Sequence, residues 1–143
     1  MDLVKINGIV YDVIVTAIEE NPEIVEGSNS GTALYRQRDI RDIVGVKYSH
    51  KITFSPNDEN PELFDTLFSD LFDNVRESVF IEVVHGQTTI SYEARYSTSS
   101  RRVNYISKIK DADTEDETDF IHWDDLTIEF RSIETVINAL GVQ

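Results

Sequence analysis

The sequence contains no cysteine, and only three prolines, six glycines and one tryptophan among its 143 residues. The lack of cysteine excludes a disulfide framework, a thiolate nucleophile and a cysteine-ligated metal. The apolar runs are only a few residues long, which argues against a membrane-spanning helix. Thirteen basic residues stand against 27 acidic ones, and the net charge of −14 makes unaided binding to a phosphate backbone unexpected.

The chain also lacks the residue spacings of known catalytic and phosphate-binding motifs. No Gly-x-Ser-x-Gly motif is present, and the glycine stretch at 27–31 has no lysine where a phosphate-binding loop needs one. The histidines His50, His85 and His122 are far apart in the sequence, so none forms a local metal-binding pair. His50 is expected to be a hydrogen-bonded core residue. We therefore predict no enzyme, no catalytic residue, no cofactor and no metal site.

What is present is a chain with 40% hydrophobic residues, enough for one domain over residues 1–143 with one core. Alternation of apolar and polar residues predicts most of the chain to be strand. Asn7-Gly8 favours a tight turn, and the segment after it is apolar on both faces, as in a strand covered on both sides. The predicted strands after that turn are 9–18, 46–54, 79–84, 88–96, 103–109 and 121–133.

One segment, residues 60–74, has the three-and-four spacing of an amphipathic helix. Asn60-Pro61-Glu62 is a favourable helix start, with Asn60 as the capping residue. The apolar residues of its predicted buried face are Leu63, Phe64, Leu67, Phe68, Leu71, Phe72 and Val75. For residues 132–140, a short helix and a continued strand are equally consistent with the sequence.

Over residues 27–45 the apolar residues follow neither the spacing of a strand nor that of a helix. This predicts a long loop that is functional or ordered by a partner. Residues 27–54 carry five basic and two acidic side chains, and residues 93–110 carry five basic and one acidic, in an otherwise acidic chain. The two basic segments either neutralise charge within the chain or meet the acidic surface of a neighbouring copy, head to tail. The predicted contact residues are Arg36, Arg38, Ile40, Arg41, Ile43 and Val44.

Residues 111–119 hold six carboxylates in nine positions. Their start resembles a calcium-binding EF-hand loop, but no glycine occupies its sixth position and His122 stands where its final glutamate belongs. We interpret the segment as an exposed hairpin tip, with a weak cation site or a contact surface for a basic partner as the alternatives.

The order of these elements predicts a mainly β (α+β) fold. It is an antiparallel β-sandwich or partial barrel, with one helix packed over an edge or open end.

Six elements together carry a family resemblance across most of the chain. They are Ile6-Asn7-Gly8, the loop reaching Asp42-Ile43-Val44-Gly45, the strand 47–54, the helix 61–72, the strand ending Arg95-Tyr96-Ser97, and the closing segment 123–130. In this pattern the chain resembles the small tail proteins of long-tailed bacteriophages and prophages, with a tail-tube-like fold. The resemblance implies a β-sandwich with one flanking helix that assembles into rings, a long loop that reaches the next subunit, and no cofactor.

The functional expectation is therefore a non-enzymatic structural component of a tail: tube, tip, baseplate or connector. Its partners are expected to be other copies or other tail proteins, with no direct nucleic acid, no membrane and no small-molecule substrate. It is expected in the virion tail, and in the bacterial host cytoplasm during assembly. The alternatives are an acidic DNA mimic that inhibits a nucleic-acid-binding protein, and a small-ligand binding barrel or minor enzyme.

Overall fold

Antiparallel strands make up most of the computed structural model, which describes residues 3–26, 31–33, 38–40, 43–98, 100–110 and 116–138. One α-helix, α1 (Glu62–Phe68), continues directly into a π-helical turn, η1 (Ser69–Asp73). The strands are β1 (Val4–Ile6), β2 (Ile14–Glu26), β3 (Gly31–Ala33), β4 (Arg38–Ile40), β5 (Ile43–Ser55), β6 (Val79–His85), β7 (Thr88–Thr98), β8 (Val103–Lys110), β9 (Glu117–Trp123), β10 (Leu126–Ser132) and β11 (Ile137–Asn138).

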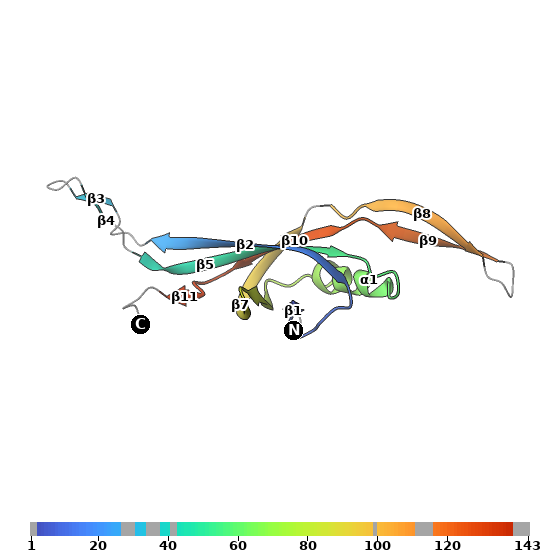
Figure 1. Cartoon of the computed structure of the whole chain (residues 1–143), viewed down its shortest axis with the longest axis horizontal. Coiled ribbons are helices and arrows are strands. Elements are labelled where there is room, and N and C mark those ends of the chain that lie inside the picture. Colours follow the sequence, from blue (N-terminus) through green and yellow to red (C-terminus); the bar gives the residue numbers. More distant parts are fainter. Residues whose placement is uncertain are drawn as a thin grey trace.

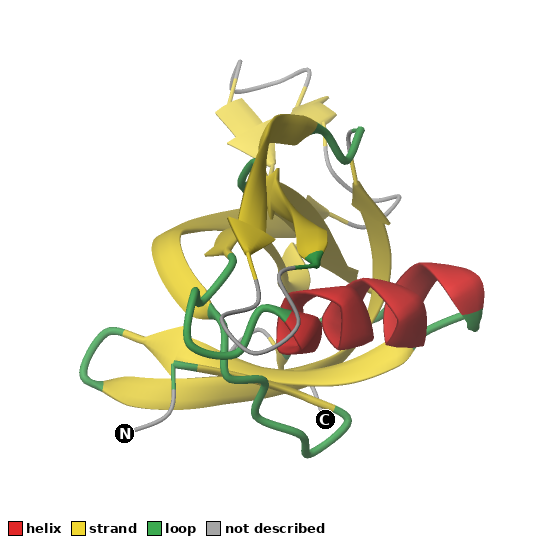
Figure 2. Ribbon diagram, turned by 90° about the vertical axis from the view of Figure 1, so that its right-hand side faces the viewer, coloured by secondary structure: helices red, strands yellow, loops and turns green. Residues whose placement is uncertain are grey.

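The main sheet has the order β1-β6-β7-β10-β5, with β2 along the other side of β5 and β11 also paired with β5. Every described pairing is antiparallel. The sheet curls around the core with the helix lying against it, and it does not close into a barrel (Figure 2). The mainly β fold with one helix is confirmed.

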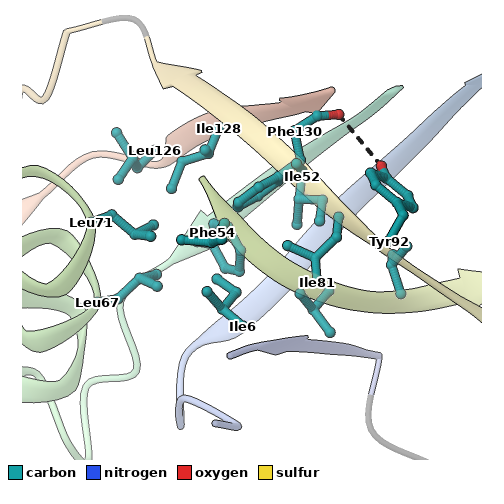
Figure 3. Packing of buried hydrophobic residues seen from close by; sticks show 14 of the residues in the cluster. Ile6, Ile52, Phe54, Leu67, Leu71, Ile81, Tyr92, Leu126, Ile128 and Phe130 are labelled. Carbon is teal, nitrogen blue, oxygen red and sulfur yellow. Dashed lines mark hydrogen bonds between the residues drawn. The ribbon is translucent and has the colours of Figure 1, made fainter. Parts of the chain in front are cut away.

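Alternating residues of the central strands and one face of the helix form the core (Figure 3). Ile52, Ile81 and Ile128 from three strands are fully buried, and they belong to the same core cluster as Leu67 of the helix. The alternation predicted for β5 and for the β6–β7 hairpin is confirmed, because its apolar face is the buried one. The interior is filled by packed side chains, and burial of each large one contributes about 1.5–3 kcal/mol.

The predicted helix is confirmed, but two details of it are wrong. Asn60 does not cap the helix: its side-chain amide donates instead to Asp12, at 2.6 Å. Val75 lies beyond the end of the π-helical turn and is exposed, so it is not part of the buried face.

The first long strand differs most from its prediction. Residues 9–13 precede β2, and Ile9, Val10 and Ile14 are all about half exposed, so the expected strand covered on both sides is wrong. Instead β2 is an edge strand that continues through Pro22 to residue 26. Proline and glutamates are tolerated there because one side of an edge strand needs no sheet partner.

Three other segments are also divided differently from the prediction. The long loop 27–45 contains the β3–β4 pair, and its last three residues belong to β5. The predicted strand 121–133 is two strands, because Asp124 and Asp125 separate β9 from β10. Residues 137–138 form the short strand β11, so the described part of the C-terminal segment is extended rather than helical.

Two strand pairs project from this body in opposite directions along the longest axis of the molecule (Figure 1). The outer parts of β2 and β5, with β3 and β4 at their end, form what we call the β2–β5 arm. Strands β8 and β9 form a separate two-stranded sheet, which we call the β8–β9 arm.

Candidate functional site

The β8–β9 arm exposes more apolar surface than a solvated hairpin needs. Five of its large apolar side chains are between 38% and 60% exposed: Val103, Tyr105, Ile106, Ile109 and Ile121. The strand register places Ile106 opposite Ile121 on one face, and Tyr105 opposite His122 on the other. A two-stranded sheet is only marginally stable in water by itself. Apolar side chains exposed on both faces make this arm a candidate contact surface.

At the root of this arm lies a groove of about 640 Å³, which we call the root groove. It is lined by β8, β9 and the turn after β9, and by the end of β5, the loop 56–61 and the first turn of α1. Its aromatic lining comes from Tyr105, Phe120, His122 and Trp123, and its carboxylates are Asp58, Glu62, Asp65, Asp119, Asp124 and Asp125.

Only two of these carboxylates have a cationic partner among the described residues. Arg101 forms an ion pair with Asp65, and Arg102 pairs with Asp124 at 2.6 Å. The hydrogen bond from Arg102 holds the pKa of Asp124 below its usual range. The remaining four carboxylates give the root groove an excess of negative charge that suits a basic ligand.

Arg101 fixes the arm to the body. Its side chain is 16% exposed, and its guanidinium carbon lies 3.8 Å from the ring centre of Trp123 at the end of β9. The same group lies 4.6 Å from Phe68 and 5.4 Å from Phe64 of the helix. A cation enclosed by aromatic rings is attracted by their electron-rich faces. Arg101 thus joins the root of the β8–β9 arm to the helix.

Four of the six predicted contact residues lie in strands on the other side of the body from the root groove. Arg38 and Ile40 are in β4, and Ile43 and Val44 begin β5, at the far end of the β2–β5 arm (Figure 1). Arg36 and Arg41 lie outside the described residues. The structure therefore places β4 and the start of β5, from the first basic segment, away from the acidic root groove, whereas Arg101 and Arg102 of the second basic segment lie beside it.

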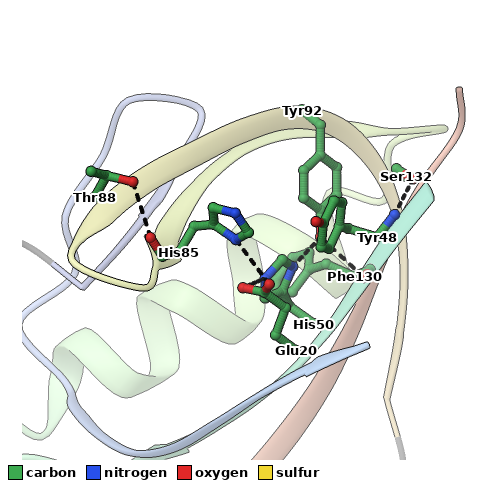
Figure 4. A network of polar contacts seen from close by, with 8 residues as sticks. All are labelled: Glu20, Tyr48, His50, His85, Thr88, Tyr92, Phe130 and Ser132. Atoms are coloured by element: carbon green, nitrogen blue, oxygen red, sulfur yellow. Dashed lines mark hydrogen bonds and ion pairs between the residues drawn. The ribbon is translucent and has the colours of Figure 1, made fainter. Parts of the chain in front are cut away.

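A partly buried polar cluster, which we call the histidine clamp, joins the β2–β5 arm to the body (Figure 4). Glu20 of β2 bonds His50 Nε2 at 3.1 Å with one oxygen and His85 Nδ1 at 2.8 Å with the other. The other nitrogen of His50, Nδ1, lies 2.5 Å from the hydroxyl of Tyr92. The prediction that His50 is a hydrogen-bonded core histidine is confirmed.

The protonation states in the clamp follow from burial. Burial lowers the pKa of His50, although Glu20 opposes this shift. Burial also raises the pKa of Tyr92, and the Glu20 carboxylate adds to it. Tyr92 is therefore a neutral phenol that donates to Nδ1 of His50, whose Nε2–H donates to Glu20. Held in this way, Tyr92 is not a phenolate, and both ring nitrogens of His50 are engaged.

A partly buried serine–histidine contact lies on the β8–β9 arm. Ser107 Oγ lies 2.9 Å from His122 Nε2, and His122 stacks on Tyr105 with ring centres 4.0 Å apart. A hydrolase dyad needs a third group that orients the imidazole. Within the described ranges, no carboxylate bonds the other nitrogen of His122 and no group of three acidic or histidine side chains could hold a metal ion.

Comparison with protein-family models, with curated proteins and with solved structures finds no match for this chain. Among the described residues, no helix is long and apolar enough to cross a membrane. The arms and the root groove are therefore the features on which a function has to be argued.

Sequence reasoning missed the root groove, Arg101 and the partners of His50. The groove is assembled from segments around residues 58, 105 and 125, which no local spacing relates. The one available signal was the position of Arg101 and Arg102 at the start of the second basic segment, next to a strand rich in apolar residues.

Proposed function

We propose that the protein is a non-enzymatic structural component of a bacteriophage or prophage tail and that it acts through contacts with other copies or other tail proteins. The observation that carries the proposal is the pair of arms that leave opposite ends of a small β body (Figure 1). One of them has apolar side chains exposed on both faces. Surfaces at opposite ends suit a chain that contacts a neighbour on each side, as in a ring or stacked assembly.

Two further features support assembly over the alternatives. The interior of the curled sheet is filled by side chains such as Phe54 and Phe130, which disfavours a ligand-binding barrel. A DNA mimic needs carboxylates spaced regularly along one face, whereas on β2 and β5 Glu19 and Glu23 stand opposite Lys51 and Lys47. The resemblance of the sequence to small tail proteins points the same way.

The proposal is tested by deleting the gene from the phage or prophage that carries it. We expect particles with absent or malformed tails in electron micrographs, and normal tails when the gene is supplied in trans. Infectious particles with normal tails in the deletion strain would contradict the proposal. A complementing copy with Val75→Ala, a change at an exposed position outside the arms and the groove, serves as the control and should restore tails fully.

A further inference from the structure

The root groove is acidic, whereas the segment between β2 and β5 is slightly basic. The groove contains Asp58, Glu62, Asp119 and Asp125 without a cationic partner among the described residues. The segment, residues 27–42, carries the arginines at 36, 38 and 41 against the aspartates at 39 and 42, a net charge of +1. Because β3 and β4 of this segment lie at the end of the β2–β5 arm, and the groove lies on the other side of the body at the root of the β8–β9 arm, a contact between them joins two molecules (Figure 1).

We infer that the root groove is the acceptor for the end of the β2–β5 arm of a second copy of this chain. The inference rests on the proposed function and deepens it by naming the surface that receives the arm. The groove fits such an occupant because it combines carboxylates with aromatic rings. Arginine pairs with carboxylates in a forked geometry and also stacks on aromatic faces.

The same chemistry already operates beside the groove. Arg101 of the chain itself lies over Trp123 and pairs with Asp65, and both of these partners also line the groove. An incoming arginine would find equivalent partners in Tyr105, Glu62 and Asp58, which face the same groove. The exposed Ile14 and Ile121 at its margin provide apolar contact for the rest of the incoming segment.

A contact of this kind is heterologous, because the arm of one copy meets the groove of the next. It follows that each molecule offers one donor end and one acceptor end. The net charge of −14 opposes association, so the interface is expected to be weak in the isolated protein and sensitive to salt.

The test uses two full-length variants that each retain one end. The arm variant carries Arg36→Ala, Arg38→Ala and Arg41→Ala, and the groove variant carries Asp58→Lys and Glu62→Lys, so that the two altered ends do not attract each other in the mixture. Each should be monomeric alone in analytical ultracentrifugation, because its altered end no longer attracts the intact one. An equimolar mixture should form a 1:1 dimer that does not grow further, with a dissociation constant raised at least about tenfold by 0.5 M salt.

A monomeric mixture at protein concentrations up to about 1 mM overturns the inference, whether or not the unaltered protein associates. Circular dichroism and unfolding curves confirm that each variant is folded. If the groove variant fails to fold, Asp125→Lys replaces it, because this exposed residue lies in the turn between β9 and β10.

A control places the same change of charge in the acidic segment that links β8 to β9 in the sequence, with Asp113→Lys and Glu115→Lys. This variant should associate with a dissociation constant within about threefold of the unaltered protein. Loss of association in the control alone would make this acidic segment the acceptor and contradict the inference. A dimer from the mixture together with absence of the chain from tails would refute the proposed function and leave this interface standing. A monomeric mixture with the chain present in tails would refute this interface and leave the proposed function standing.

Discussion

Replacement of Arg101 by alanine is expected to loosen the β8–β9 arm from the body. The side chain is 16% exposed and its guanidinium lies within 5.4 Å of the ring centres of Trp123, Phe68 and Phe64. Cation–π contacts contribute roughly 0.5–2 kcal/mol each, depending on how far water is excluded. Its ion pair adds little, because Asp65 is 62% exposed.

One opposing effect reduces the stability that these contacts of Arg101 contribute. Nε of Arg101 is buried without a hydrogen-bond partner among the described residues, and removing the side chain relieves that desolvation cost. The net expected loss is therefore about 1–3 kcal/mol in the free energy of unfolding. Arg101→Lys keeps the charge but loses the planar stacking, so we expect an intermediate loss.

The assay is chemical denaturation together with hydrogen exchange of the amides in β8 and β9. Arg102→Ala is the matched control, because Arg102 is the adjacent arginine and its side chain is 76% exposed. We expect the control to leave the unfolding midpoint unchanged, and Arg101→Ala to lower it and to speed exchange in the arm. Equal behaviour of the two variants would refute the idea that Arg101 holds the arm on the helix.

Three further outcomes are expected. Leu67→Ala should destabilise the fold by about 2–5 kcal/mol in denaturant titrations, because Leu67 is fully buried between helix and sheet; equality with Val75→Ala would refute that packing. Because burial lowers the pKa of His50, the folded state binds fewer protons than the unfolded state, so stability should fall as pH drops below about 6.5; a flat profile between pH 7.5 and pH 5, measured against His50→Gln, would contradict this. Calcium titration calorimetry should detect no strong binding to the segment 111–119, and submicromolar affinity would restore the EF-hand alternative.

Elements with a regular local period could be predicted from the sequence. Apolar residues alternate around Ile52 and Tyr92, and they recur at three and four positions around Leu67, so each pattern indicates one buried face. For this reason β5, β7 and the helix lie close to their predicted positions. The turn at Asn7-Gly8 was also predictable, because both residues adopt positive φ in the structure.

Features set by tertiary context could not be predicted in this way. Glu19 to Glu26 with Pro22 looks like a break between elements, yet the segment is strand because β5 supplies pairing on one side and the other side stays open. The clamp on His50 unites residues 20, 50, 85 and 92 from four strands, and only the curl of the sheet brings them together. The candidate contact residues 36–44 remain a prediction, because their assignment rests on composition and position alone.

The central claim is that this chain is a structural part of a tail. Quantitative mass spectrometry of purified particles, from cells that carry the gene, tests it most directly. We predict that the chain is present in several copies per particle and stays with the tail fraction after heads and tails are separated. Its absence from purified particles, in cells that express it during particle production, would contradict the account.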